Sequence, residues 1–170
     1  MTIARCFVAL DLGEAALATA ADAQELLDAD VVRKSAAETM HLTIKFLGQV
    51  DVDAVARKVF EAVAPFGGPS MALGEGRIQG FPAIERARVV VLECAACDSR
   101  LAEMAARADD AAFALGVPRE GRPFRPHVTL ARSKKDFDAR KIAARFGARP
   151  LGFATDLVLY ESAGGKYKAL

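Results

Sequence analysis

The chain has no tryptophan, only two histidines and three cysteines in 170 residues. It also lacks any apolar run that approaches the roughly 20 residues needed for a membrane-spanning helix. Its first residues, MTIARCFVALDLG, are typical of a strand and lack the basic opening, long apolar core and small-residue cleavage site of a secretory signal. We therefore expect a cytoplasmic protein with no membrane partner.

The three cysteines form no even set that would suggest a disulfide framework, which agrees with a reducing compartment. Cys94 and Cys97 have the spacing of a redox motif or of half a zinc site. A structural zinc ion normally takes four ligands, and no second C-x-x-C is present to supply the other two. We interpret the pair as small apolar residues where a strand gives way to a helix, and we expect neither a metal nor a cofactor.

The formal net charge of +1 argues against a protein that coats long nucleic acids, because phosphate contacts dominate such binding. The charge is nevertheless uneven, since basic residues outnumber acidic ones between positions 119 and 145. This segment suits a small anionic ligand or a nucleic-acid end, and it equally suits a solvated helix face. Its basic members are Arg119, Arg122, Arg125, Arg132, Lys134, Lys135, Arg140, Lys141 and Arg145.

With 52% hydrophobic and 26% charged residues, the chain can form one domain over 1–170 with a buried core. Consecutive strands at 70–80 and 86–93 favour an α+β class with antiparallel pairing over a doubly wound sheet. No strand is followed by a glycine-rich phosphate-binding motif, which excludes Rossmann and P-loop folds. The other expected strands are 3–10, 40–48, 127–132, 151–161 and 166–170, and the expected helices are 14–29, 52–64, 100–115 and 137–146.

The two histidines occupy matching positions, His41-Leu-Thr43 and His127-Val-Thr129, about half the chain length apart. Residues two apart on a strand project from the same face, so each histidine shares a face with its threonine. If the chain forms two similar lobes around a pseudo-twofold axis, the two motifs can meet across one cleft.

Two imidazoles and two hydroxyls in one cleft suit in-line displacement at phosphorus. One imidazole can act as base beside the attacking oxygen and the other as acid beside the leaving oxygen, because an unperturbed imidazole can fill either role near neutral pH. The threonine hydroxyls can donate to the remaining phosphoryl oxygens. The alternative is that each histidine is structural and each threonine simply a good strand former.

The segments HLTIKFLG and RPFRPHVTLAR resemble the paired H-x-T motifs of the 2H phosphoesterase superfamily. Within it, the chain looks most similar to the RNA 2′,3′-cyclic phosphodiesterases of the ThpR/LigT type, also called RNA 2′-5′ ligases. RCFVALDL, FPAIERARVVVLE and LVLYESAGGKY resemble the family's first strand, central hairpin and closing strands. The resemblance implies a bilobal LigT-like α+β fold: two pseudo-twofold-related, mainly antiparallel sheets with helices outside and a central cleft.

The resemblance also implies metal-independent opening of a 2′,3′-cyclic phosphate, on an RNA end or a nucleotide, to a 2′-phosphomonoester. By position, His41 would be the proton donor to the 3′ oxygen and His127 the proton acceptor from water, with Thr43 and Thr129 binding phosphate. We expect a monomer with no obligate protein partner. The alternatives are a 2′-5′ ligase or phosphodiesterase acting on tRNA fragments or oligonucleotides, and a non-catalytic module that binds RNA ends.

Two further candidates depend on strand geometry. Arg132 matches an arginine that ends the second motif in the family and is a candidate phosphate ligand. Strict alternation would point it away from Thr129, so its role requires a bulge or twist. Lys45 shares the face of His41 and Thr43 by alternation, and we expect it at the cleft edge or in solvent.

The remaining candidates concern the nucleic acid itself. Arg125, two residues before His127, would face the same way and reach the RNA backbone. Phe7 is a candidate for stacking on a base, with burial in the core as the alternative. The stretch between Ser162 and Tyr167 is shorter than is usual in the family, so a loop that contacts ribose or base is expected to be reduced there.

Overall fold

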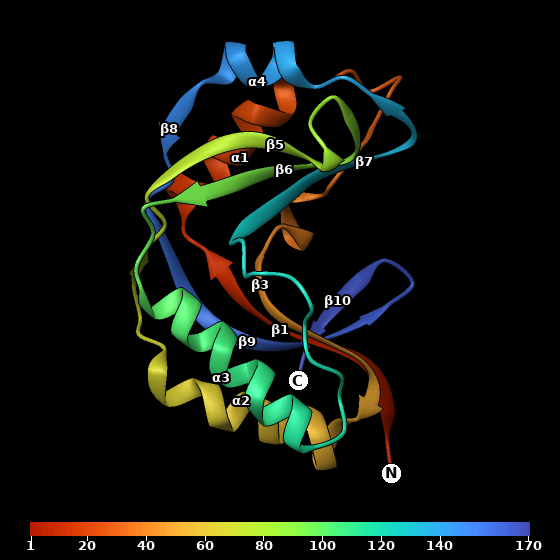
Figure 1. Cartoon of the computed structure of the whole chain (residues 1–170), viewed down its shortest axis with the longest axis vertical. Helices are drawn as coiled ribbons and strands as arrows, with labels where there is room; N and C mark the ends of the chain where they lie inside the picture. The colour runs from red at the N-terminus through yellow and green to blue at the C-terminus, as the bar shows by residue number, and fades with distance from the viewer.

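The structure, a computed structural model, describes residues 1–170 and combines one large sheet with helices on its outer faces (Figure 1). The strands are β1 (Ile3–Leu12), β2 (Arg33–Lys34), β3 (Leu42–Asp51), β4 (Met71–Ala72), β5 (Glu75–Ala83), β6 (Arg86–Ala95), β7 (His127–Phe137), β8 (Ala148–Pro150), β9 (Phe153–Ala163) and β10 (Lys166–Ala169). The α-helices are α1 (Glu14–Glu25), α2 (Arg57–Val63), α3 (Arg100–Ala114) and α4 (Arg140–Phe146). The short helical turns are η1 (Ala37–Thr39), η2 (Val52–Ala56) and η3 (Ala64–Phe66).

All strand pairs are antiparallel, and the order is β10-β9-β1-β3-β7-β6-β5-β8, with β2 beside β7 and β4 beside β9. The first lobe holds β10, β9, β1 and β3, and the second holds β7, β6, β5 and β8. The strands of the two lobes are joined through a single residue pair, Leu42 with Val128. The two expected sheets therefore meet at one point and form one continuous antiparallel sheet, which confirms the α+β class.

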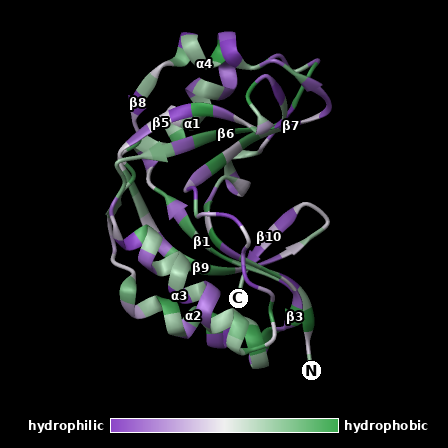
Figure 2. Cartoon of the chain, in the orientation of Figure 1, coloured by the Kyte–Doolittle hydropathy of each residue, from purple (hydrophilic) through white to green (hydrophobic).

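The helices are exchanged between the lobes. Helix α1 follows the first strand but packs on β7 and β8, whereas α3 follows β6 and packs on β3 (Figure 1). Helices α2 and α3 contact each other on the outside of the first lobe. Hydrophobic and hydrophilic segments alternate along both, as expected for helices that bury one side (Figure 2). None of the helices has the length and apolar character required to cross a membrane.

Aspartates begin three of the helical segments. Asp51 accepts a hydrogen bond from the Ala54 amide at 2.6 Å, as expected for a helix that starts after it. That segment begins as a π-helical turn and continues as α2. Asp98 and Asp138 accept hydrogen bonds from the amides of Arg100 and Arg140 at 2.9 and 3.0 Å.

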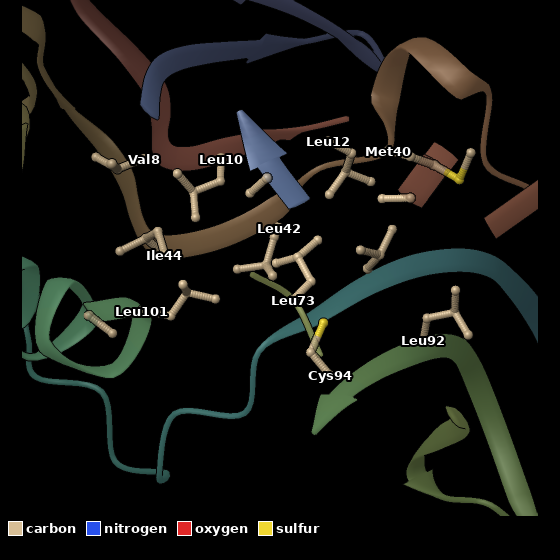
Figure 3. Close-up of a cluster of buried hydrophobic side chains, with 14 of the residues drawn as sticks. Val8, Leu10, Leu12, Met40, Leu42, Ile44, Leu73, Leu92, Cys94 and Leu101 are labelled. Atoms are coloured by element: carbon tan, nitrogen blue, oxygen red, sulfur yellow. The ribbon is translucent and has the colours of Figure 1, made fainter. Parts of the chain in front are cut away.

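One hydrophobic core runs through both lobes. Val8, Leu10 and Ile44 lie on the first-lobe side, and Leu92 lies on the second-lobe side (Figure 3). Leu42 lies between them and is fully buried. This core lies behind the point where β3 and β7 meet.

The C-x-x-C pair takes no part in a disulfide. Cys94 is buried in the core at the end of β6, and Cys97 is half-buried just beyond it. Burial raises the pKa of the Cys94 thiol to about 12, with smaller contributions from Cys97 and Glu93. A thiol that resists ionisation suits the apolar role expected from the sequence.

Candidate active site

The two H-x-T motifs meet where the lobes join. Leu42 pairs with Val128, and both side chains are buried in the core. The residues on either side of this pair project from the opposite face of the sheet. The structure therefore brings His41, Thr43, His127 and Thr129 to one face, with each histidine diagonally across from the other.

A bulge follows each motif. In β3, Thr43 pairs with Ala9 and Lys45 with Val8, so Ile44 is the extra residue. In β7, Thr129 pairs with Val91 and Ala131 with Val90, so Leu130 is the extra residue. A bulged residue reverses the alternation beyond it.

The bulges leave Phe46 and Arg132 at equivalent positions, both facing the same side as the threonines. Phe46 pairs with Phe7, and Arg132 pairs with Val89, two residues from the partner of Thr129. One lobe thus presents an aromatic ring beside the motif, and the other presents a guanidinium group. The bulge that the assignment of Arg132 requires is present, and Arg132 is exposed.

The expected position of Lys45 is wrong for the same reason. Because of the bulge at Ile44, its side chain faces the helices and is only 6% exposed. Its Nζ donates to Asp109 Oδ1 in α3 at 2.9 Å and to the Pro118 carbonyl at 3.4 Å. Lys45 therefore fastens α3 to β3 and does not reach the cleft.

The expectation that Phe7 stacks on a base also needs correction. Phe7 lies on the site face but is only 4% exposed, because other rings cover it. Its ring centroid lies 5.4 Å from Tyr160, 4.9 Å from Tyr167 and 5.8 Å from Phe46. The exposed rings of this cluster are Phe46, at 60%, and Tyr167, at 39%.

A two-glycine turn at Gly164-Gly165 closes the β9–β10 hairpin, and both glycines have positive φ. This is the stretch expected to be short, and it places the Tyr167 ring 5.7 Å from the ring of His41. The short hairpin thus contributes an aromatic side chain to the site.

His127 is oriented by main-chain and aromatic contacts. Its Nδ1–H donates to the Arg125 carbonyl at 2.7 Å, which leaves the lone pair on Nε2. The ring meets Phe81 edge to face at 5.3 Å. These contacts fix the orientation of the imidazole and leave its Nε2 without a partner in the protein.

Arg125 does not extend freely toward a ligand. Its Nε donates to Glu93 Oε2 at 2.5 Å, and its guanidinium lies 5.0 Å from the Phe81 centroid. The contact of Arg125 with the RNA backbone stays a prediction, and the guanidinium is 53% exposed while paired with Glu93. The carbonyl of Arg125 holds the ring of His127.

His41 has a different environment. Tyr160 donates its hydroxyl proton to Asp11 Oδ1 at 2.6 Å, so the tyrosine oxygen can only accept from His41 Nε2, 3.1 Å away. His41 Nε2 also lies 3.4 Å from Asp11 Oδ1. This chain of contacts places a proton on Nε2 of His41.

Burial lowers the pKa of His41, and the carboxylate of Asp11 and the carbonyl of Thr39 offset part of that effect. Burial and the contact with Asp11 also raise the pKa of Tyr160, which keeps the phenol protonated. Sequence reasoning missed Asp11 and Tyr160. The only available signal was that Asp11 follows Phe7 and Ala9 at two-residue spacing on one strand.

A pocket of about 300 Å³ opens beside His41 and is lined by Asp11, Glu38, Thr155 and Tyr160, among other residues. No three His, Cys, Asp or Glu side chains gather where they could hold a metal ion. The polar groups that face the motifs are therefore imidazole, hydroxyl, carboxylate and guanidinium.

A bilobal antiparallel fold with one H-x-T motif from each lobe on a shared face defines a 2H phosphoesterase. The chain belongs to the 2′-5′ RNA ligase superfamily, whose family pattern it matches over residues 2–165. No curated protein matches the sequence.

Solved structures share the fold. The crystal structure of E. coli LigT complexed with 3′-AMP has a TM-score of 0.78 and 24% identity, covering 99% of this chain and 96% of that one. The apo form of E. coli LigT has a TM-score of 0.75 at 24% identity, covering 100% and 96%. The protein TT0787 of Thermus thermophilus has a TM-score of 0.71 at 22% identity, covering 98% and 94%.

Proposed function

We propose that the chain hydrolyses the 2′,3′-cyclic phosphate of an RNA end or a nucleotide to a 2′-phosphomonoester by acid–base catalysis between His41 and His127. The observation that carries this proposal is the pairing of Leu42 with Val128, which places both imidazoles on one face. Membership of the 2′-5′ RNA ligase superfamily supports the reaction class.

The hydrogen bonds of the two histidines favour one direction of proton transfer. His127, with its lone pair on Nε2, removes a proton from water as the water oxygen bonds to phosphorus. His41, once protonated, exchanges the contact of its Nε2–H with Tyr160 for one with the 3′ oxygen, and gives that hydrogen to this oxygen as the bond between the oxygen and phosphorus breaks. The product keeps the phosphate on the 2′ oxygen, and the two protons and the water are accounted for.

The charge that builds on the phosphoryl oxygens has ligands on the same face. Thr43 and Thr129 can donate their hydroxyl protons to these oxygens, and the exposed guanidinium of Arg132 adds a positive charge. A preorganised donor of this kind is typically worth about 100-fold or more in rate.

The first lobe suits the nucleoside. The exposed rings of Phe46 and Tyr167 offer apolar surfaces on which a base can stack. E. coli LigT, which has the same fold, has been solved with 3′-AMP and with phosphate. These structures support a nucleotide or phosphate ligand for this chain.

The proposal is tested with 2′,3′-cyclic AMP in the presence of EDTA, followed by identification of the phosphomonoester isomer. We expect the 2′-phosphate as product and a loss of at least ~100-fold in rate for His41→Ala and for His127→Ala. Arg145→Gln, an exposed substitution in α4, is the control variant. Circular dichroism checks that all three variants fold.

Other outcomes would contradict the proposal. A 3′-phosphate product would reverse the identity of the leaving oxygen. Joining of oligonucleotide halves without hydrolysis would favour a 2′-5′ ligase. If the native protein binds 2′,3′-cyclic AMP but does not hydrolyse it, a module that only binds RNA ends would be favoured.

A further inference from the structure

We infer that a basic groove beside the second motif binds the backbone phosphates upstream of the reacting end, so that the chain prefers oligoribonucleotides to mononucleotides. This inference rests on the proposed function. The groove has a volume of about 620 Å³, and its cationic lining residues are Arg33, Arg132, Lys134 and Lys135.

The groove is continuous with the site because Arg132 belongs to both. Arg132 faces the same side as Thr129 and also lines the groove. It pairs directly with Arg33 of β2, whose side chain therefore projects from the same face. An anion bound at the motifs and one bound in the groove would be neighbours.

A large bulge in β7 builds the other wall. Arg132 pairs with Val89 and Phe137 with Ala87, so residues 133–136 of β7 stand opposite Arg88 alone. The hydroxyl of Ser133 bridges the carbonyls of Val31 and Lys135, at 3.1 and 2.6 Å, and holds the bulge against the segment before β2. The end of β7 and this segment lie side by side in Figure 1. The bulge presents Lys134 and Lys135 to the groove.

The cations of the groove have no ion-pair partners within the protein. None of the four takes part in an ion pair. By contrast, Arg119, Arg125 and Arg140, from the same basic stretch of sequence, are each paired with a carboxylate. Three unpaired cations of that stretch, Arg132, Lys134 and Lys135, thus gather at the groove, where Arg33 of β2 joins them.

The acidic residues of the groove do not neutralise it. Asp136 is engaged by Arg88 at 2.6 Å, which leaves Asp30 as the free carboxylate among the lining residues. In addition, two arginines directly opposite one another on paired strands repel, and such pairs destabilise a sheet. A bound anion relieves that repulsion.

The chemistry of the proposed substrate identifies the anion. An RNA strand that ends in a 2′,3′-cyclic phosphate continues only on the 5′ side of its last ribose. Once that ribose and its cyclic phosphate occupy the site, the remaining charges are the upstream backbone phosphates. The groove is the adjoining unneutralised basic surface on the same face, so the upstream phosphates are its natural occupants.

The test compares native protein with the variant R33Q/K134Q/K135Q, which leaves Arg132 in place. The control is K58Q/R145Q, which removes exposed charges from α2 and α4. The probes are 2′,3′-cyclic AMP, a tetranucleotide ending in a 2′,3′-cyclic phosphate, and the labelled tetranucleotide 2′-phosphate product for direct binding by fluorescence anisotropy.

For the native protein we expect a lower KM for the tetranucleotide than for 2′,3′-cyclic AMP. We also expect its Kd for the labelled product to weaken about tenfold between 50 and 200 mM salt, the dependence of two or three phosphate contacts on a single strand. In the groove variant, the Kd for the labelled product and the KM for the tetranucleotide should each rise at least ~10-fold, while hydrolysis of 2′,3′-cyclic AMP stays unchanged. The control variant should match the native protein in all three measurements.

Equal product affinity in the native protein and the groove variant would overturn the inference, as would equal loss in the control variant. The binding measurement does not depend on turnover. If neither substrate is hydrolysed but the groove variant still loses affinity for the product, the proposed function fails and the groove remains a phosphate-binding site.

Discussion

Replacement of Asp11 by asparagine should shift the pH dependence of the reaction in one direction. Asp11 lies 3.4 Å from His41 Nε2 and accepts the hydroxyl proton of Tyr160. Its charge raises the pKa of His41, against the larger effect of burial, which lowers it. In D11N burial acts without that compensation, so the pKa of His41 falls further while the shape of the side chain is kept.

The size of the effect follows from the geometry. Two unit charges 3.4 Å apart interact by about 1.2 kcal/mol in bulk water, and a hydrogen bond to a charged group contributes about 1.5–3 kcal/mol. The Asp11 side chain is 36% exposed, and solvent screens its charge. The interaction of Asp11 with protonated His41 therefore lies at the lower end of this range, at about 1.5 kcal/mol. This corresponds to about a tenfold smaller protonated fraction of His41 at pH 7.

The assay is a pH–rate profile of 2′,3′-cyclic AMP hydrolysis. An acid catalyst is active only below its pKa, so activity falls as pH rises through the pKa of His41. In D11N this alkaline limb should move to lower pH, with about a tenfold loss at pH 7 that shrinks as the pH is lowered. Asp156→Asn, which removes an exposed carboxylate from the neighbouring β9, is the matched control.

Two results would contradict these roles of Asp11 and His41. If the profiles of D11N and the native protein coincide, Asp11 does not stabilise protonated His41. If D11N moves the acidic limb and leaves the alkaline limb unchanged, His41 acts as the base, and the two histidines exchange roles.

Other predictions concern single side chains. Asp109→Asn should lower the free energy of unfolding in urea by about 3–5 kcal/mol, because it leaves the buried Lys45 ammonium without its ion-pair partner. Lys45→Met should lower it by only about 1 kcal/mol, since Asp109 keeps its ion pair with Arg119. Arg132→Gln should lower kcat by about 10- to 100-fold, with partial recovery in Arg132→Lys, as measured by steady-state kinetics. Phe46→Ala should raise KM for cyclic AMP about tenfold at unchanged kcat, the effect of one lost stacking contact; an unchanged KM would contradict stacking there. EDTA should leave the rate unchanged, and a loss restored by a divalent ion would contradict catalysis by the two imidazoles alone.

The local parts of the fold could be predicted from the sequence. Two-residue alternation placed each histidine on the face of its threonine, and this depends only on the geometry of an extended strand. The helix starts at Asp51 and Asp98 follow from a side-chain oxygen next to free amides, which is also a local effect. The α+β class followed from consecutive strands without a helix between them.

The bulges could not be predicted, because an extra residue in a strand depends on the register of its partner. That register sent Lys45 to the helices and brought Arg132 to the site, where alternation had placed each on the other side. Asp11 and Tyr160 were missed because 149 residues separate them in the chain, and only the pairing of β1 with β9 brings their side chains together.

Which side chains share a strand face can thus be read from the sequence, because covalent geometry and short-range sterics set the alternation along a strand. The tertiary structure alone decided which charges are neutralised and which stay free. Arg125 forms an ion pair with Glu93 and Lys45 forms one with Asp109, whereas the cations of the groove form none. Ion pairing depends on distances across the fold, which no spacing along the chain encodes.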